Sequence, residues 1–151
     1  MALDDDIRTL SGVALFQSLG DEHLRLLAFG ADTVNLPAGS RLYREGDIAD
    51  TAFVVVSGRI GLYRNRDGAQ ELVGAIDPGA ILSEFALIAE SQRLTEAQAL
   101  RDSRLLRIDR KSFMRILEEY PALASSLYDS ISENLQALIR RIDLLSPHFE
   151  N

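Results

Sequence analysis

The spacing of apolar residues predicts helices at both ends of this chain. Within residues 21–29, Leu24, Leu27 and Ala28 are separated by three and one positions, which places them on one face of a short helix. From residue 110 onward the spacing is helical again. The two ends of the chain are therefore expected to be helical, and the segment between them to be different.

The longest helix is expected over residues 122–145, where apolar residues recur every three or four positions along one stripe. They are Leu123, Leu127, Ile131, Leu135, Leu138, Ile142 and Leu145. A leucine and isoleucine stripe of this length predicts a homodimer formed through the C-terminal helix. Packing of the stripe on the chain's own strands is the alternative for its first two turns.

Between the helical ends, short apolar segments alternate with turn residues, a pattern typical of β-strands. Eight of the ten glycines lie between residues 30 and 79, and none follows. Strands are expected over residues 32–36, 41–44, 51–56, 59–64, 70–76, 80–82, 95–100 and 104–108, with a helical segment over 83–89. The predicted fold class is α+β, mainly β: a double-stranded β-helix or jelly-roll β-barrel with N-terminal helices and a long C-terminal helix.

The length of 151 residues fits one domain and is too short for two ordinary ones. We expect a single domain over residues 1–151, with a β-roll over about 32–109 and C-terminal helices over about 110–146. No apolar run approaches the roughly 20 residues that a membrane-spanning helix needs. The acidic start lacks the positive charge of a signal peptide. A cytoplasmic location without membrane association is therefore expected.

Composition excludes several kinds of chemistry. Cysteine is absent, and the two histidines, His23 and His148, lie at opposite ends of the chain. Disulfides, thiolate nucleophiles, a hydrolase triad and the histidine cluster of a cupin-like metalloenzyme are therefore not expected. The net charge of −7 repels phosphate backbones, so nucleic acid is not an expected partner. The chain is predicted to be a binding protein with no enzymatic activity, no metal and no cofactor.

One segment combines residues that suit an anionic ligand. A turn, a short strand and a helix start would place the backbone N–H groups of residues 83–86 at a helix N-terminus, where free donors and the helix dipole attract an anion. Glu84 lies in that first turn, and Arg93 follows nine residues later. The arginine and the N–H groups suit a phosphate, while the carboxylate suits a sugar hydroxyl. The alternative is a helix-start acid with its salt-bridge partner.

Short motifs along residues 15–145 share an order and a spacing with one known family. They are Leu15-Phe16 with Leu19, Leu36-Pro37-Ala38-Gly39, Glu45-Gly46-Asp47, Phe53-Val54-Val55-Val56-Ser57-Gly58, Pro78-Gly79, Ser83-Glu84-Phe85-Ala86-Leu87, Arg93, Ala99 and Pro121-Ala122-Leu123-Ala124. In this arrangement the chain resembles the cyclic nucleotide-binding domain family, which includes the sensor domains of Crp/Fnr-type regulators and the regulatory subunits of protein kinase A. The resemblance implies the fold expected above.

The resemblance also implies a phosphate-binding cassette and a role for its members. Glu84 would accept a hydrogen bond from the ribose 2′-hydroxyl, and Arg93 would pair with the cyclic phosphate. The N–H groups of Phe85 and Ala86 would point at that phosphate. The implied ligand-binding set is Ser83, Glu84, Phe85, Ala86, Arg93, Leu94 and Thr95. The expected ligand is cAMP or cGMP, and the sequence does not choose between them.

The cassette departs from the family pattern at four positions. Ser83 stands where the family usually has glycine, and glycine is needed only if the backbone adopts a positive φ. Gln92 replaces the proline before the arginine. Leu94 replaces a small or hydroxyl residue, so it offers an N–H group but no hydroxyl. Glu96 adds an acid near the expected phosphate position.

The favoured interpretation is a stand-alone cyclic nucleotide sensor that acts on an effector protein whose identity the sequence does not give. One alternative is a degenerate fold that serves as a ligand-free protein-interaction or dimerisation module. Another is a Crp/Fnr-type transcriptional regulator lacking its DNA-binding domain. Only six residues follow Leu145, whereas a helix-turn-helix module needs two further helices, and the acidic charge also disfavours DNA.

Overall fold

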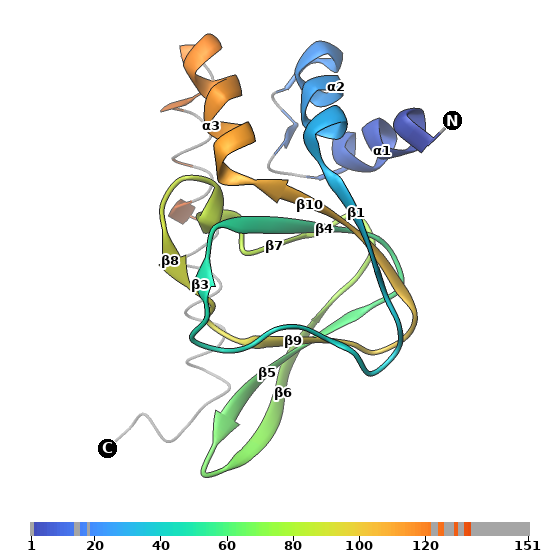
Figure 1. Ribbon diagram of the computed structural model, residues 1–151, viewed down its shortest axis with the longest axis vertical. Helices are drawn as coiled ribbons and strands as arrows, with labels where there is room; N and C mark the ends of the chain where they lie inside the picture. Colours follow the sequence, from blue (N-terminus) through green and yellow to red (C-terminus); the bar gives the residue numbers. More distant parts are fainter. Residues whose placement is uncertain are drawn as a thin grey trace.

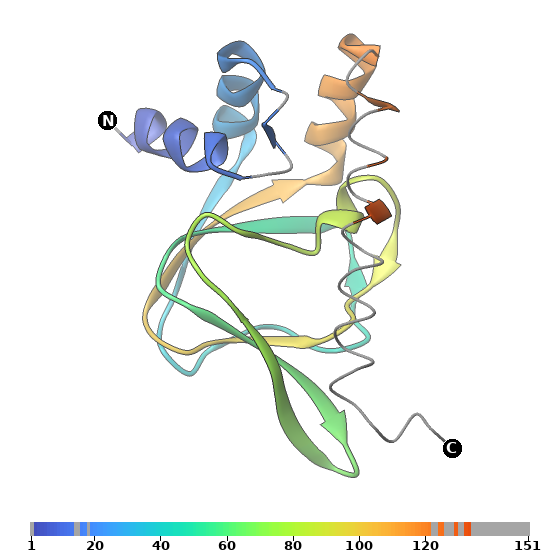
Figure 2. The same ribbon diagram turned by 180° about the vertical axis from the view of Figure 1, so that it is seen from behind.

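The computed structural model shows a roll of β-strands with helices gathered on one side (Figures 1 and 2). It describes residues 2–13, 16–17, 19–121, 124–125, 129 and 132–133. Helices α1 (Ala2–Ser11) and α2 (Asp21–Gly30) precede the strands, and α3 (Arg110–Glu119) follows them. The predicted jelly-roll fold class with flanking helices is confirmed, although the strands form separate sheets and no closed barrel. No helix of these described residues is long and apolar enough to span a bilayer.

One sheet lies directly beneath the helices. Its strands, all antiparallel, are in the order β1 (Asp32–Leu36), β10 (Ser103–Asp109), β4 (Thr51–Ser57) and β7 (Ile81–Leu82). Strand β4 is almost wholly apolar because both of its faces are buried. Ala52 and Val54 pack against the helices, while Phe53 and Val55 face the interior of the roll. Successive side chains of a strand point to opposite faces, so a strand buried on both sides has no polar face.

The second sheet closes the other side of the roll. Its strands are in the order β2 (Arg41–Tyr43), β9 (Glu96–Ala99), β5 (Ile60–Arg66) and β6 (Ala69–Ile76). The β5–β6 hairpin extends away from the helical layer (Figure 1). A two-stranded ribbon of β3 (Ile48–Ala49) and β8 (Ser91–Gln92) lies at the edge of the roll. This ribbon carries the segment that contains the candidate site.

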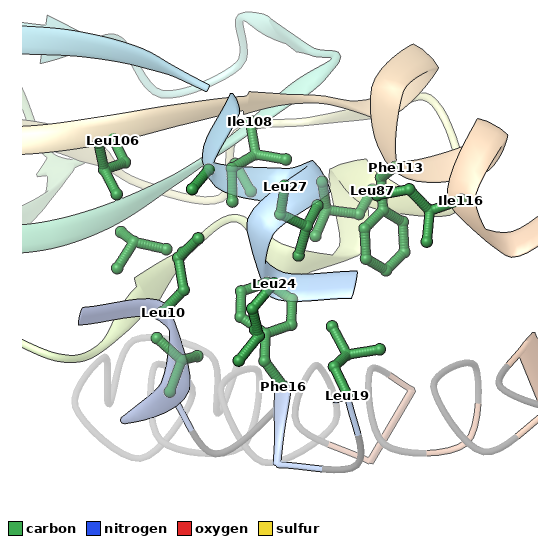
Figure 3. Close-up of a cluster of buried hydrophobic side chains, with 14 of the residues drawn as sticks. Leu10, Phe16, Leu19, Leu24, Leu27, Leu87, Leu106, Ile108, Phe113 and Ile116 are labelled. Atoms are coloured by element: carbon green, nitrogen blue, oxygen red, sulfur yellow. The ribbon is translucent and has the colours of Figure 1, made fainter. Parts of the chain in front are cut away.

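The apolar side chains form two cores, one on each face of the first sheet. The helix core joins the three helices to β4 and β10, and it includes Leu10, Phe16, Leu24, Leu27, Leu87, Leu106, Ile108, Phe113 and Ile116 (Figure 3). The roll core lies between the two sheets and includes Phe53, Val55, Ile60, Leu62, Leu82, Ala97 and Leu105. The short 3₁₀ helix η2 (Glu84–Leu87) places Leu87 in the helix core, fully buried. Leu82, five residues earlier, belongs to the roll core.

Most of the predicted elements agree with the structure to within two residues. Leu24, Leu27 and Ala28 are the buried face of α2, as their spacing predicts. The expected helix over residues 83–89 is only the four-residue η2. Strands β3 and β8 were not predicted, because two-residue strands are too short to show an alternating pattern. Of the expected helix over residues 122–145, only residues 124–125, 129 and 132–133 are described, and these are helical; the apolar stripe of the expected dimer interface lies outside the described residues.

Gly58 lies at a tight turn, and its substitution provides a test of this packing. The residue has φ +92°, and an added Cβ would lie 2.2 Å from Ser103 Oγ and 2.5 Å from the Asp102 carbonyl oxygen. Gly79 has nearly the same φ, +91°, but open space around the Cβ position. We expect Gly79→Ala to lower the free energy of unfolding by about 1–2 kcal/mol, from backbone strain alone.

Gly58→Ala should cost about 1–3 kcal/mol more than Gly79→Ala, because the strain is joined by a steric clash with backbone. Urea denaturation monitored by circular dichroism measures both variants, and an unchanged m-value shows that midpoints report stability. Equal midpoints for the two variants would contradict the close approach of the β4–β5 turn to residues 102–103.

Candidate ligand-binding site

The backbone of Arg93 is held by the turn that follows β2. The Arg93 N–H donates to the Asp47 carbonyl at 2.7 Å, and the Gly46 N–H donates to the Arg93 carbonyl at 2.9 Å. Both bonds continue the β3–β8 ribbon by one residue. The Glu45-Gly46-Asp47 motif and the predicted arginine, almost fifty residues apart, are therefore neighbours, and Arg93 is fixed before its side chain makes any contact.

The Arg93 side chain is buried inside the roll, with 7% of its surface exposed. Its Nη1 donates to the Thr51 carbonyl at 2.9 Å, and its Nη2 donates to Thr51 Oγ1 at 3.0 Å. The guanidinium carbon lies 4.4 Å from the centre of the Tyr43 ring and 5.6 Å from that of Phe53. Two donated hydrogen bonds and two aromatic faces thus set the orientation of the cation.

The charge of Arg93 has no close counter-ion in the described part of the chain. No carboxylate there lies within ion-pairing distance of it. Burial lowers the pKa of Arg93, and the phenol of Tyr43 and the more distant carboxylates of Asp50 and Asp47 oppose that shift. Its Nε is buried without a hydrogen-bond partner among the residues that the structure describes. A buried cation with a spare donor favours binding of an anion at this point.

Tyr43 also joins the two ends of the predicted cassette. Ser83 Oγ donates to the Tyr43 hydroxyl oxygen at 3.3 Å, and the buried Thr95 side chain lies near the same phenol. Burial raises the pKa of Tyr43, while these two hydroxyls and the Arg93 charge oppose the shift. Ser83, Arg93 and Thr95 are therefore brought together around one tyrosine of β2.

Ser83 adopts a backbone conformation that explains why the family usually has glycine at this position. It has φ 60° and ψ 40°, the left-handed conformation that favours glycine, so the backbone does require a positive φ here. Helix η2 starts only after it. The Ala86 N–H donates to the Ser83 carbonyl at 2.9 Å, which closes the first turn. The resemblance assigned this N–H group to the phosphate, and in this structure it is bonded within the turn.

The other predicted site residues lie on the same chain segment, between Ser83 and Thr95. Glu84 begins η2 and is partly buried. Phe85 packs against the helix core, and Ala86 is buried. Leu94 has 39% of its surface exposed, between the buried Arg93 and Thr95. Contact of these residues with a nucleotide stays a prediction.

Sequence reasoning missed two residues that hold Arg93. Tyr43 and Thr51 come from β2 and β4, well before the cassette. A signal for Thr51 exists, because it is the polar member of the inward-facing series that continues with Phe53 and Val55. Tyr43 gives no comparable signal, since an aromatic residue in a strand is most simply explained as part of the core.

Glu96 does not approach Arg93 as the sequence suggested. Its carboxylate lies 3.3 Å from Arg41 Nε and accepts a hydrogen bond from the Gln98 side chain. The neighbouring Ala97 belongs to the roll core, so Glu96 points to the opposite face of β9. Burial disfavours its charge, but hydrogen bonds from Gln98 and Gln70 together with Arg41 hold the pKa of Glu96 below its ordinary value.

The lowered pKa of Glu96 predicts a pH-dependent contribution to stability. The ionised side chain stabilises the fold above the ordinary glutamate pKa of 4.5, and this contribution is lost as the pH falls through the lower pKa of the folded state. Glu96→Gln should therefore lower the free energy of unfolding at pH 7 and cost progressively less as the pH falls below 4.5. Urea titrations across this pH range test this. A penalty that does not change with pH would contradict the ionic role of Glu96.

Substitution at Ser83 tests the strained turn. Ser83→Gly and Ser83→Ala both remove the hydroxyl and differ only in the Cβ atom. We expect the glycine variant to be more stable by about 1 kcal/mol, because alanine is strained at positive φ. Thermal unfolding monitored by circular dichroism measures the difference. Alanine as the more stable residue would contradict the left-handed conformation, since elsewhere it stabilises relative to glycine.

The comparisons with known proteins agree with this arrangement. The model of the cyclic nucleotide-binding domain family matches residues 33–120. A cyclic nucleotide-binding-like protein from Brucella abortus is 50% identical, with a TM-score of 0.70 over 76% of this chain and 99% of that chain. The regulatory domain of Toxoplasma gondii PKA, solved with cAMP, is 26% identical, with a TM-score of 0.73 over 85% of this chain and 49% of that one.

Among curated proteins, the cyclic AMP receptor protein of Thermus thermophilus is 28% identical over 91% of this chain. The match spans 64% of the length of that receptor. The family match covers more than half of the chain, and it includes Tyr43, Thr51, Ser83, Arg93 and Thr95. This chain belongs to the cyclic nucleotide-binding domain family.

Proposed function

We propose that this chain is a regulatory module that binds a cyclic nucleotide, and that cAMP is the ligand to test first. The observation that carries the proposal is the buried Arg93 guanidinium, which lacks a counter-ion among the described residues and keeps an unpartnered Nε. The comparisons support cAMP through two relatives, a receptor named for cyclic AMP and a kinase regulatory domain solved with cAMP.

Arg93 retains enough donors for a phosphate. An arginine side chain carries five N–H donors, and Thr51 accepts two of them. The remaining three include the buried Nε, so the guanidinium can offer a fork of parallel hydrogen bonds to two phosphate oxygens. Glu84, at the start of η2, is proposed to accept from the ribose 2′-hydroxyl. The N–H groups of Phe85, Leu94 and Thr95 complete the proposed set.

A change in the position of η2 on ligand binding would be transmitted directly to the helices. Helix η2 carries the cassette residues Glu84, Phe85 and Ala86, and its last residue, Leu87, packs in the helix core with residues of α2 and α3. A ligand that draws η2 towards Arg93 would have to repack that core. The shift cannot exceed the difference in the ligand's affinity for the two arrangements. A regulatory output on an effector protein, and homodimerisation through residues 122–145, belong to this proposal.

A degenerate module without a ligand is the second candidate, and Leu94 is the observation that favours it. Its side chain offers no hydrogen bond, although the family usually has a small or hydroxyl residue there. The Ala86 N–H is also occupied by the Ser83 carbonyl. In this candidate the fold acts only through contacts with other proteins.

Calorimetric titration with cAMP and cGMP tests the proposed function. Arg93→Ala should weaken binding of the preferred nucleotide about 10- to 150-fold, because a charge-assisted hydrogen bond contributes roughly 1.5–3 kcal/mol. Glu84→Ala should weaken the same nucleotide but have little effect on its 2′-deoxy analogue, which lacks the contacted hydroxyl. Arg8→Ala, an exposed site on α1, is the matched control for lost charge and should bind like wild type.

Two outcomes would contradict the sensor proposal. One is Arg93→Ala binding the nucleotide as tightly as wild type, with both proteins folded by circular dichroism. The other is no heat from wild type with either nucleotide at millimolar concentration. If Leu94→Ser binds under those same conditions, the degenerate-module candidate replaces the sensor, because one hydroxyl then restores a site that the chain has lost.

A further inference from the structure

Tyr43 makes more contacts to the candidate site than its position on β2 suggests. Its ring lies under the Arg93 guanidinium at 4.4 Å and beside the Phe53 ring, with 6.2 Å between the ring centres. Its hydroxyl accepts a hydrogen bond from Ser83 Oγ, and the Thr95 side chain lies near it. One side chain therefore contacts the arginine and both ends of the segment that surrounds it.

The ring restricts where the guanidinium can lie. Thr51 holds the two terminal nitrogens from one edge, but two hydrogen bonds to one residue leave the plane of the guanidinium free to tilt about them. The Tyr43 face removes that freedom, because a cation over an aromatic ring is attracted to its π-face. The edge of the guanidinium that carries the unpartnered Nε then points in one fixed direction.

The hydroxyl restricts the chain on both sides of the arginine. Ser83 occupies a strained backbone position just before η2, and Thr95 lies two residues after Arg93. The Ser83 hydroxyl donates to the phenol oxygen and Thr95 lies near it, so Tyr43 contacts the segment on both sides of the arginine. The hydrogen bond from position 83 is specific to a serine there, because the glycine that the family usually has offers no side chain.

We propose that Tyr43 is a positioning residue for the ligand-binding arginine: its ring aligns the Arg93 guanidinium, and its hydroxyl holds Ser83, at the start of the segment, beside it. The inference rests on the proposed cyclic nucleotide site and adds a determinant of its affinity outside the cassette. Tyr43 itself contacts no ligand in this proposal. It acts through Arg93.

Two substitutions distinguish the contribution of the Tyr43 ring from that of its hydroxyl. Tyr43→Phe keeps the aromatic ring and removes the hydroxyl that accepts a hydrogen bond from Ser83, and we expect cAMP to bind about three- to tenfold more weakly by calorimetry. Tyr43→Leu removes both, and we expect about ten- to a hundredfold weaker binding. Tyr63→Leu is the matched control. Tyr63 lies on β5 of the same sheet, opposite Glu96 on β9, and its replacement should leave the affinity unchanged.

A spectroscopic measurement distinguishes positioning from general stability. In the ligand-free protein the order parameter of the Arg93 Nε–H bond, from nuclear magnetic resonance relaxation, reports how firmly the guanidinium is held. It should be nearly unchanged in Tyr43→Phe and Tyr63→Leu and should fall in Tyr43→Leu, where no ring restricts the guanidinium. A structural role alone would change the melting temperature without lowering this order parameter selectively.

Binding by Tyr43→Leu that equals wild type would overturn the inference while leaving the sensor proposal intact. An Arg93 order parameter that is the same in wild type and Tyr43→Leu would also overturn it. If wild type binds neither nucleotide, the sensor proposal fails, and the claim that Tyr43 sets ligand affinity fails with it. The order parameter then still tests whether Tyr43 aligns the guanidinium, since that measurement requires no ligand.

Discussion

Removing a guanidinium from water is costly unless the protein supplies partners for it, and much of this fold supplies partners for Arg93. The turn after β2 fixes its backbone, Thr51 of β4 accepts two of its donors, and Tyr43 of β2 covers its face. All of these groups lie within residues 43–51, some forty residues before Arg93. They reach it only because the strands wind into a roll, so the geometry of the site depends on the fold as a whole.

The fold was largely predictable because its elements have the periods of regular structure. Strand β4 is apolar on both faces because it lies between two cores, and a run of five apolar residues shows this in the sequence. Ribbon β3–β8 was not predictable in this way. Its strands have two residues each, and its pairing depends on the backbone of Asp47 and Arg93 rather than on side chains with a recognisable pattern.

The sequence identified several residues of the site but not how their side chains contact one another. The motifs identified Ser83 and Arg93, and the structure places both against the same tyrosine. They gave no indication of Tyr43, because its ring resembles ordinary core packing in a sequence. They also misplaced Glu96: counting along the chain puts it three residues from Arg93, whereas strand alternation turns it to the other face, where Arg41 matches its charge.

The four residues between Leu82 and Leu87 connect the two cores, which also meet through the alternating side chains of β4. Leu82 is packed inside the roll and Leu87 among the helices, with the strained Ser83 between them. Neither core can loosen here without pulling on the other. The consequence concerns the cooperativity of unfolding: roll and helical layer are coupled through this connection, so they should melt as one thermodynamic unit despite their separate interiors.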